Sequence, residues 1–166
     1  MVSPAPHPNT SATAQPMLEI GWGAGPPLPR GMQDNDGGVI GDWLVVTGGF
    51  CGGYESDIEP HKYSRGFLRD TYGLDLRHEA AGWNRLPEFP GCARQELAAA
   101  VADQSLHVWG GFSYAEPYAY ADGYRLTQAE GAWTWEPLPP LPYPLAAAAA
   151  VATGDHLYVF GGCDYD

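Results

Sequence analysis

The sequence predicts an all-β fold made of repeated units of four short antiparallel strands. An apolar run that ends in a double glycine occurs three times, at Gly48-Gly49, Gly110-Gly111 and Gly161-Gly162. The steps between the first glycines of these pairs are 62 and 51 residues. Two further markers, Asp70 to Asp122 and Trp83 to Trp135, each recur after 52 residues. Several markers that recur in one order at one period indicate a structural repeat.

The composition suits such a fold and excludes some partners. The chain has 22 glycines and 16 prolines among 166 residues, which favours many short elements joined by tight turns. Acidic residues outnumber basic ones by 20 to 8, a net charge of −12, which repels phosphate backbones and anionic lipids. We therefore expect no nucleic-acid partner and no membrane partner.

The second unit illustrates the four strands. Strand a is "ELAAAVA" (96–102), and Asp103-Gln104 form the kind of two-residue turn that joins a hairpin. Strand b is "LHVWGG" (106–111), in which the double glycine is expected to end the strand, as in the other units. Strand c is "DGYRL" (122–126), and strand d surrounds Trp133 to Trp135. Pro137 and Pro139 are expected to end the strand ladder, because proline has no backbone N–H to donate.

The alanine runs identify strand a as the innermost strand. They occupy 98–100 in one unit and 146–150 in another. A helix is the alternative, since alanine is the best helix former, but a run this short, close behind Pro142 and Pro144, is not a stable helix by itself. Small side chains suit a strand at which neighbouring units converge on a common axis.

This order of features resembles the kelch repeat, whose period is roughly 50 residues. The double glycine is followed by Tyr72 or Tyr124, then by Trp83 or Trp135, and then by a Leu-Pro stretch. The resemblance implies a β-propeller, in which four-stranded blades surround a central channel. It also implies that these tyrosines and tryptophans pack between blades. Two departures are a long insertion after Gly49 and a proline, Pro144, near the position that Arg94 holds in the second unit.

The resemblance divides the chain into a leader and a partial propeller. Residues 1–17 are predicted to be a disordered Pro/Ser/Thr-rich leader without the features of a signal peptide. Residues 18–166 are predicted to hold a lone strand d at 18–30, blade one at about 31–87, blade two at about 88–139 and a half blade at 140–166. Because propellers have about 4 to 8 blades, we expect the remaining blades to come from sequence outside this chain.

The absence of a signal peptide and the unpaired set of cysteines favour a soluble protein in the reducing cytoplasm. The cysteines are three, at Cys51, Cys92 and Cys163, and none forms a CxxC pair. We find no cofactor motif, and we expect no cofactor and no bound metal.

The face formed by the d–a and b–c loops is the candidate binding face. The b–c loops are long, at 50–69 and 112–121, whereas the a–b turns are minimal. A pair of glutamine and acid recurs on this face, as Gln33-Asp34 and Gln95-Glu96, close to Arg94, whose fork of donors matches a carboxylate. These groups either bind a polar ligand or cap backbone groups at the start of strand a.

The long loops add aromatic and ionisable side chains. These either contact a ligand, by stacking on a sugar or anchoring a partner, or pack the loops onto the blades. The candidate ligand-binding residues are therefore Gln33, Asp34, Tyr54, His61, Arg94, Gln95, Glu96, Tyr114 and Tyr118.

Two functions remain open at this point. The first is an interaction or ligand-binding scaffold that recognises a protein or a small polar ligand such as a sugar through the d–a and b–c loop face. The alternative is a carbohydrate-active enzyme with its site at the central channel, since the repeats resemble those of bacterial N-acetylneuraminate epimerases. A galactose oxidase-type copper site is less favoured, because Cys51, Tyr54 and His61 share a loop without a matching ligand pattern. No catalytic residue is assigned.

Overall fold

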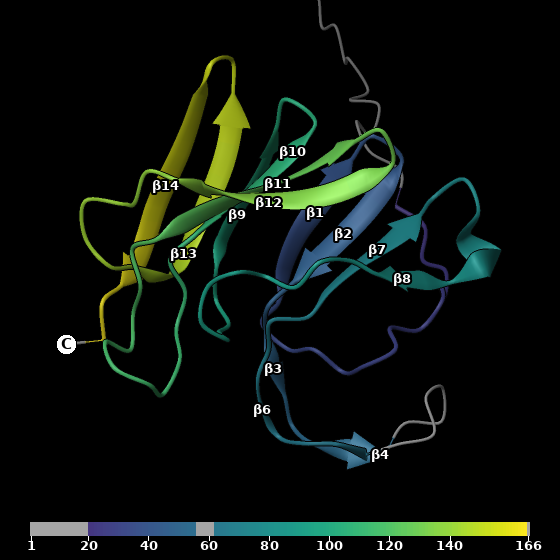
Figure 1. The fold of residues 1–166 in the computed structure, drawn as a ribbon, viewed down its shortest axis with the longest axis horizontal. Helices are drawn as coiled ribbons and strands as arrows, with labels where there is room; N and C mark the ends of the chain where they lie inside the picture. Colours follow the sequence, from purple (N-terminus) through teal and green to yellow (C-terminus); the bar gives the residue numbers. More distant parts are fainter. Residues whose placement is uncertain (1–19, 56–61, 166) are drawn as a thin grey trace, which may run out of the picture.

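The computed structural model describes residues 20–55 and 62–165, and almost all of its regular elements are antiparallel strands (Figure 1). The predicted leader at 1–17 and the candidate residue His61 lie outside the described residues. Within these residues the one helical segment is a single 3-10 turn, η1 (Glu79–Ala81). In this described part of the chain, no helix is long and apolar enough to cross a membrane.

Two four-stranded sheets and one hairpin follow one another along the described chain, and the prediction of an all-β fold of antiparallel strands is confirmed. The first sheet holds β1 (Asp36–Ile40), β2 (Trp43–Thr47), β7 (Thr71–Asp75) and β8 (Trp83–Arg85). The second holds β9 (Ala98–Ala102), β10 (Ser105–Trp109), β11 (Gly123–Ala129) and β12 (Ala132–Leu138). The hairpin is β13 (Ala146–Thr153) with β14 (His156–Cys163).

The long insertion after Gly49 forms two small ribbons within the first b–c loop. The first ribbon pairs β3 (Phe50–Cys51) with β6 (Gly66–Phe67). The second pairs β4 (Tyr54–Glu55) with β5 (Lys62–Tyr63). The insertion therefore extends away from blade one without interrupting the ladder between β2 and β7.

The strand register follows the sequence repeat. Asp36 lies opposite Thr47, Ala98 opposite Trp109, and Ala149 opposite Phe160. Successive pairs are displaced by the same 62 and 51 residues that separate the double glycines. The strand predicted at the alanine run 146–150 is confirmed and the helix alternative is excluded, because these alanines lie in β13 and pair along β14.

Strands a of successive units lie against one another, β1 beside β9 and β9 beside β13. This close approach explains their small side chains. A methyl group added to Gly38 would collide with the side chain of Val101, so even alanine is too large at that point of β1.

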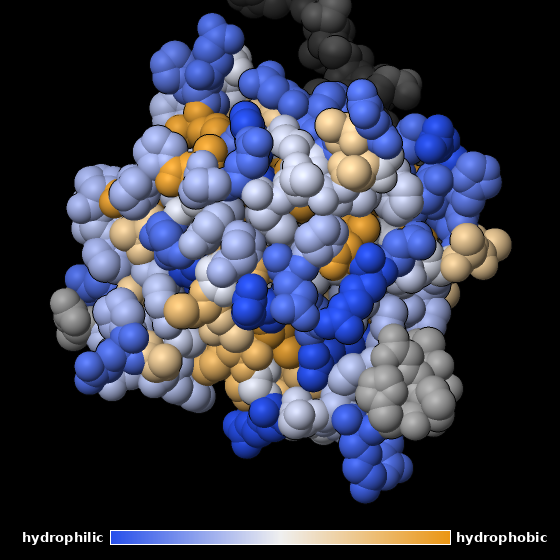
Figure 2. All heavy atoms as spheres, viewed as in Figure 1, coloured by the Kyte–Doolittle hydropathy of each residue, from blue (hydrophilic) through white to orange (hydrophobic). Residues whose placement is uncertain are grey.

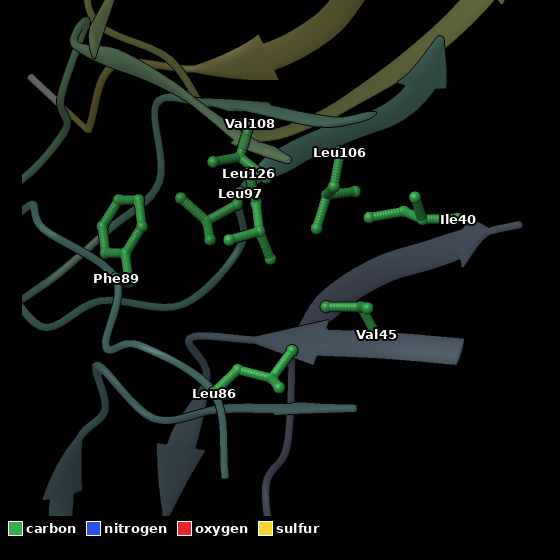
Figure 3. Close-up of a cluster of buried hydrophobic side chains, with 8 residues drawn as sticks. All are labelled: Ile40, Val45, Leu86, Phe89, Leu97, Leu106, Val108 and Leu126. Atoms are coloured by element: carbon green, nitrogen blue, oxygen red, sulfur yellow. The ribbon is translucent and has the colours of Figure 1, made fainter. Parts of the chain in front are cut away.

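The hydrophobic core lies between blades one and two (Figure 3). Both blades contribute side chains to it, and the cluster consists of Ile40, Val45, Leu86, Phe89, Leu97, Leu106, Val108 and Leu126. Aromatic rings surround the cluster: Trp43 meets Trp133 edge to face at 5.8 Å, and Phe89 meets Trp135 at 5.7 Å. The tryptophan of strand d in blade two thus packs between blades.

Three details of the predicted strands are wrong. Residues 20–30 form no strand, although the carbonyl of Pro26 accepts the indole N–H of Trp83 at 2.9 Å, just as Pro87 accepts that of Trp135 at 3.0 Å. For Trp135 of blade two, the acceptor follows strand d of the preceding blade. The segment 20–30 supplies the equivalent acceptor for Trp83 of blade one. Pro137 lies inside β12 and does not end it, because β12 is the outer strand of its sheet and is paired on one side only.

The third detail concerns the glycines of the last unit, which lie inside β14 and not after it. In the first two units the double glycine leaves the ladder because its second N–H bonds to the next unit. Gly49 donates to the carbonyl of Arg94 at 2.8 Å, and Gly111 donates to that of Leu145 at 2.8 Å. In the third unit the pairing of β13 with β14 continues to Cys163.

Alanine at Gly110 is expected to destabilise the fold by about 3 kcal/mol. Gly110 has a φ of +67°, which costs a residue with a side chain about 1–2 kcal/mol, and its new methyl group would overlap the carbonyl oxygen of Leu145. Gly131→Ala is the matched control, because Gly131 has a φ of +80° with open space around it and incurs only the backbone cost. Urea denaturation of both variants of the full-length protein measures the difference, and equal losses would contradict the inter-blade contact.

Candidate functional site

One backbone feature recurs at the start of every strand a. Asp34, Glu96 and Ala147 hold equivalent positions and have φ values of +50°, +58° and +53°, which are uncommon for residues other than glycine. The N–H of Glu96 donates to the carbonyl of Asp34 at 3.1 Å, and the N–H of Ala147 donates to that of Glu96 at 3.2 Å. A chain of backbone hydrogen bonds therefore joins the three units at this end of the sheets.

The glutamines before Asp34 and Glu96 also have a backbone role. Gln33 exchanges two backbone hydrogen bonds with Phe50, at 3.0 and 2.9 Å, and Gln95 exchanges two with Phe112, at 3.0 and 2.8 Å. The backbone of each glutamine–acid pair thus fastens the start of strand a to the b–c loop of its own unit. These backbone bonds do not involve the side-chain carboxylates; that of Asp34 belongs to an exposed residue and that of Glu96 to a half-buried one.

Three carboxyl groups line one pocket of about 250 Å³ at this end of the sheets. Asp34 and Glu96 come from the predicted pairs, and Asp36 is the first residue of β1. We call these three residues the strand-a carboxylate cluster. The other lining residues are Asn35, Leu97, Ala147 and Ala148, so the pocket lies where the three units meet.

Burial raises the pKa of Asp36 to about 7. The backbone N–H of Leu97 donates to this carboxyl and acts in the opposite direction, while the negative charges of Asp34 and Glu96 raise the pKa further. A carboxyl group that titrates near neutral pH can both give and take a proton under working conditions, as a general acid or base must.

Sequence reasoning missed Asp36, although a signal was present. Asp36 aligns with Ala98 and Ala149 in the strand pairing, so an ionisable group stands where the other units place a methyl group. Such a departure from the repeat indicates a position that the fold alone does not explain.

Arg94 is placed differently from the predicted ligand anchor. Its side chain is fully buried, and its two terminal nitrogens donate to the two carboxylate oxygens of Asp122, each at 2.6 Å. The guanidinium also lies between the rings of Phe89 and Tyr120, at 4.8 and 4.3 Å. The fork that matches a ligand carboxylate is therefore occupied by Asp122, and Arg94 joins the d–a loop to the start of strand c.

Blade one repeats this arrangement, since Arg30 donates to Asp70 at 2.5 Å directly before β7. The pair of arginine and aspartate is thus a structural feature of both complete units.

An aromatic surface adjoins the carboxylate cluster. The ring of Phe112 contacts Tyr114 at 5.4 Å and Tyr165 at 4.4 Å, and Phe67 contacts both Phe112 and Tyr114, at 5.9 and 5.1 Å. We call these four residues the aromatic platform. Tyr165 links it to the cluster, because its hydroxyl donates to Glu96 at 2.9 Å, a bond that raises the pKa of Tyr165 to about 12.

The other predicted tyrosines differ in exposure. Tyr114 is 72% exposed and Tyr118 is 42% exposed, so both are accessible to a partner. Tyr54 instead accepts a hydrogen bond from the backbone N–H of Gly31 and packs on Tyr63 at 5.4 Å. Tyr54 therefore fastens the inserted loop to the start of blade one.

The fold matches that of a solved structure titled "Structure of YjhT", with a TM-score of 0.59 and 19% sequence identity over 84% of this chain. This chain has a kelch-type β-propeller fold. The resemblance to kelch repeats is therefore confirmed, although no protein-family model matches the sequence.

Curated kelch-type relatives have similar sequences. An N-acetylneuraminate epimerase of Haemophilus influenzae is 31% identical over 82% of this chain, and one of Pasteurella multocida is 27% identical over 85%. A kelch domain-containing protein of Vibrio cholerae is 27% identical over 85% of the chain. The chain covers only 33–36% of the length of these relatives.

Proposed function

We propose that this chain forms part of a sugar site in a kelch-type propeller that acts as an epimerase on an acidic acylated sugar such as N-acetylneuraminate. The similarity to N-acetylneuraminate epimerases, which extends over more than four-fifths of the chain, carries the proposal. The placement of the strand-a carboxylate cluster beside the aromatic platform supports it, because sugar sites combine hydrogen-bonding carboxylates with an aromatic surface.

Proton transfer is the chemistry that the cluster offers. Exchange of stereochemistry at the anomeric carbon of a sugar opens the ring, so one proton leaves the anomeric hydroxyl and another reaches the ring oxygen. Asp36 supplies the proton donor, since its carboxyl retains a proton close to neutral pH. Glu96 supplies the acceptor, and the side chains of Gln95 and Tyr165 orient its carboxylate by donating to it at 3.1 and 2.9 Å.

The sugar's own carboxylate needs a partner outside the cluster. Asp34, Asp36 and Glu96 repel an anion, Arg30 and Arg94 are both held by aspartates, and Arg65 and Arg69 line a different pocket. We therefore propose that residues beyond this chain bind the sugar carboxylate and that additional blades complete the ring.

The unpaired edge of the last hairpin supports the additional blades. Strand b is paired with strand c in both complete blades, whereas β14 has a partner on one side only in the described chain. Val151, Tyr158 and Phe160 are exposed on this hairpin, and Figure 2 shows hydrophobic surface at the upper left, in the region of the hairpin.

The proposal is tested by exchange NMR of the two anomers of N-acetylneuraminate. Adding the full-length protein should speed their interconversion, and Glu96→Gln should reduce this rate by about 10²- to 10⁴-fold. Asp103→Asn, in the a–b turn on the opposite face, should keep the wild-type rate. A wild-type protein that does not change the exchange rate would contradict the epimerase.

A binding scaffold is the second candidate, and the exposure of Tyr114 on the aromatic platform favours it. The same spectra separate the two functions. If the sugar resonances broaden or shift while the exchange rate stays at its uncatalysed value, the face binds the sugar without turning it over.

A further inference from the structure

Folding gathers basic side chains that are scattered along the sequence. The chain has only eight lysines and arginines, yet four of its arginines line one pocket of about 290 Å³ beside blade one. The pocket lies where the first b–c loop returns to strand c, next to the end of strand d. We call it the arginine pocket, and its lining residues include Arg30, Arg65, Arg69, Arg85, Asp70 and Glu88.

Two of the arginines are fixed by carboxylates inside the pocket. Asp70, whose side chain is only 8% exposed, accepts hydrogen bonds from Arg30 at 2.5 Å and from Arg85 at 3.1 Å. Glu88 accepts a further bond from Arg85 at 2.9 Å. These contacts neutralise two of the four positive charges and hold one wall of the pocket in place.

The other two arginines keep donors for a ligand. The guanidinium of Arg65 lies 5.5 Å from the ring of Phe50, and the Nε of Arg69 donates to the carbonyl of Phe89 at 2.7 Å. Both side chains reach solvent. Neither has a carboxylate within ion-pair distance among the residues at 20–55 and 62–165. Since a guanidinium has five N–H donors, each retains several for an incoming group.

We propose that the arginine pocket binds a small anionic metabolite that carries a carboxylate or phosphate group. The planar donors of Arg65 and Arg69 match both groups, and charge-assisted bonds of this kind are stronger than neutral ones. Four positive and two negative side chains make the pocket locally positive in a protein of net charge −12, so it attracts an anion that the rest of the surface repels. A volume of about 290 Å³ lies at the small end of ligand pockets and suits a ligand of monosaccharide size.

The charged groups of this site differ from those of the proposed epimerase site. The two pockets share no lining residue, although Phe67 of the aromatic platform also lines the arginine pocket, and the carboxylate cluster lies where blades one and two meet the third unit. Loss of anion binding here and loss of epimerase activity are therefore distinguishable.

Calorimetric titration of the full-length protein with inorganic phosphate, glucuronate and uncharged glucose tests the proposal. At least one of the two anions should bind and glucose should not bind here; the preferred anion identifies the charged group that the pocket recognises. Arg65→Gln and Arg69→Gln should each weaken anion binding by roughly ten- to a hundredfold. Arg77→Gln is the control, because Arg77 is exposed beside Asp42 and Asp75, outside the pocket.

Urea denaturation should show both pocket variants to be as stable as the Arg77→Gln control. Failure of phosphate and glucuronate to bind at about 10 mM would overturn the proposal. Wild-type affinity in both pocket variants would also overturn it, because the anion would then bind elsewhere. An equal loss of affinity in Arg77→Gln would overturn it as well, because the anion would then respond only to overall charge.

Discussion

Asp36→Asn is expected to reduce the proposed epimerase rate by about 10²- to 10⁴-fold and to stabilise the fold above pH 7. Asparagine keeps the size of the side chain but cannot transfer the proton that Asp36 holds near neutral pH. The two effects have opposite signs, and a residue retained only for structure would not show this combination.

The sign of the stability effect follows from the raised pKa of Asp36. The carboxyl titrates at about 7 in the folded chain and near 3.8 when unfolded, so the folded state binds more protons between these values. Stability is therefore lost as the pH rises from about 4 to 7, and the full cost is present above pH 7. The shift corresponds to at most about 4 kcal/mol, and solvent that reaches the pocket reduces it. Asp36→Asn removes this pH-dependent cost.

Urea denaturation at pH 5 and pH 8, together with anomer exchange across the same range, measures both effects. The wild-type rate should fall as the pH rises through about 7, because the protonated carboxyl is the donor. Asp155→Asn, in the exposed turn between β13 and β14, is the matched control and should change neither quantity. An active Asp36→Asn variant would remove Asp36 from the mechanism, and equal stability changes at both pH values would show that its carboxyl is not held protonated.

The repeat is the part of the fold that could be predicted from the sequence, because each unit has the same register. Gly48 and Gly110 end strand b for the same reason. Each donates its backbone N–H to the carbonyl of the residue directly before strand c, and the glycine that follows each of them donates to the next unit. The alanines of β9 and β13 were recognisable as inner strands because small side chains recur in the same place. Pro137 was misjudged because its tolerance depends on being in an outer strand, which is a property of the assembled sheet.

The site was harder to predict for a different reason. The partner of Arg94, Asp122, lies 28 residues away, so its burial depends on how the d–a loop folds over the blade. The arginine pocket likewise combines residues from the first b–c loop, strand d and the segment before blade one. Tyr114, Tyr118 and Glu96 were named from the sequence because long loops and repeated pairs are local patterns. Whether these residues bind a ligand stays a prediction.

Arg94→Ala is expected to lower the free energy of unfolding by about 3 kcal/mol, because it breaks an ion pair in which the arginine is fully buried. The loss lies at the low end of the range for such pairs, since the side chain of Asp122 is 40% exposed and regains water. The space between Phe89 and Tyr120 would also be left unfilled. Arg125→Ala is the control: its ion pair with Glu136 is exposed on both sides and should contribute less than about 1 kcal/mol.

The pH dependence of Arg94→Ala identifies the ion pair as the cause. Burial acts to raise the pKa of Asp122, but the hydrogen bonds and charge of Arg94 outweigh it and hold this pKa below its ordinary value of 3.8. The pair therefore stabilises the fold above about pH 4, and this contribution is lost as the pH falls through the lowered pKa. Urea denaturation of the full-length protein should show that the difference in stability between wild type and Arg94→Ala becomes smaller below that pH. A constant difference between them at every pH would assign the loss to the packing of Arg94 between the two rings and not to its charge.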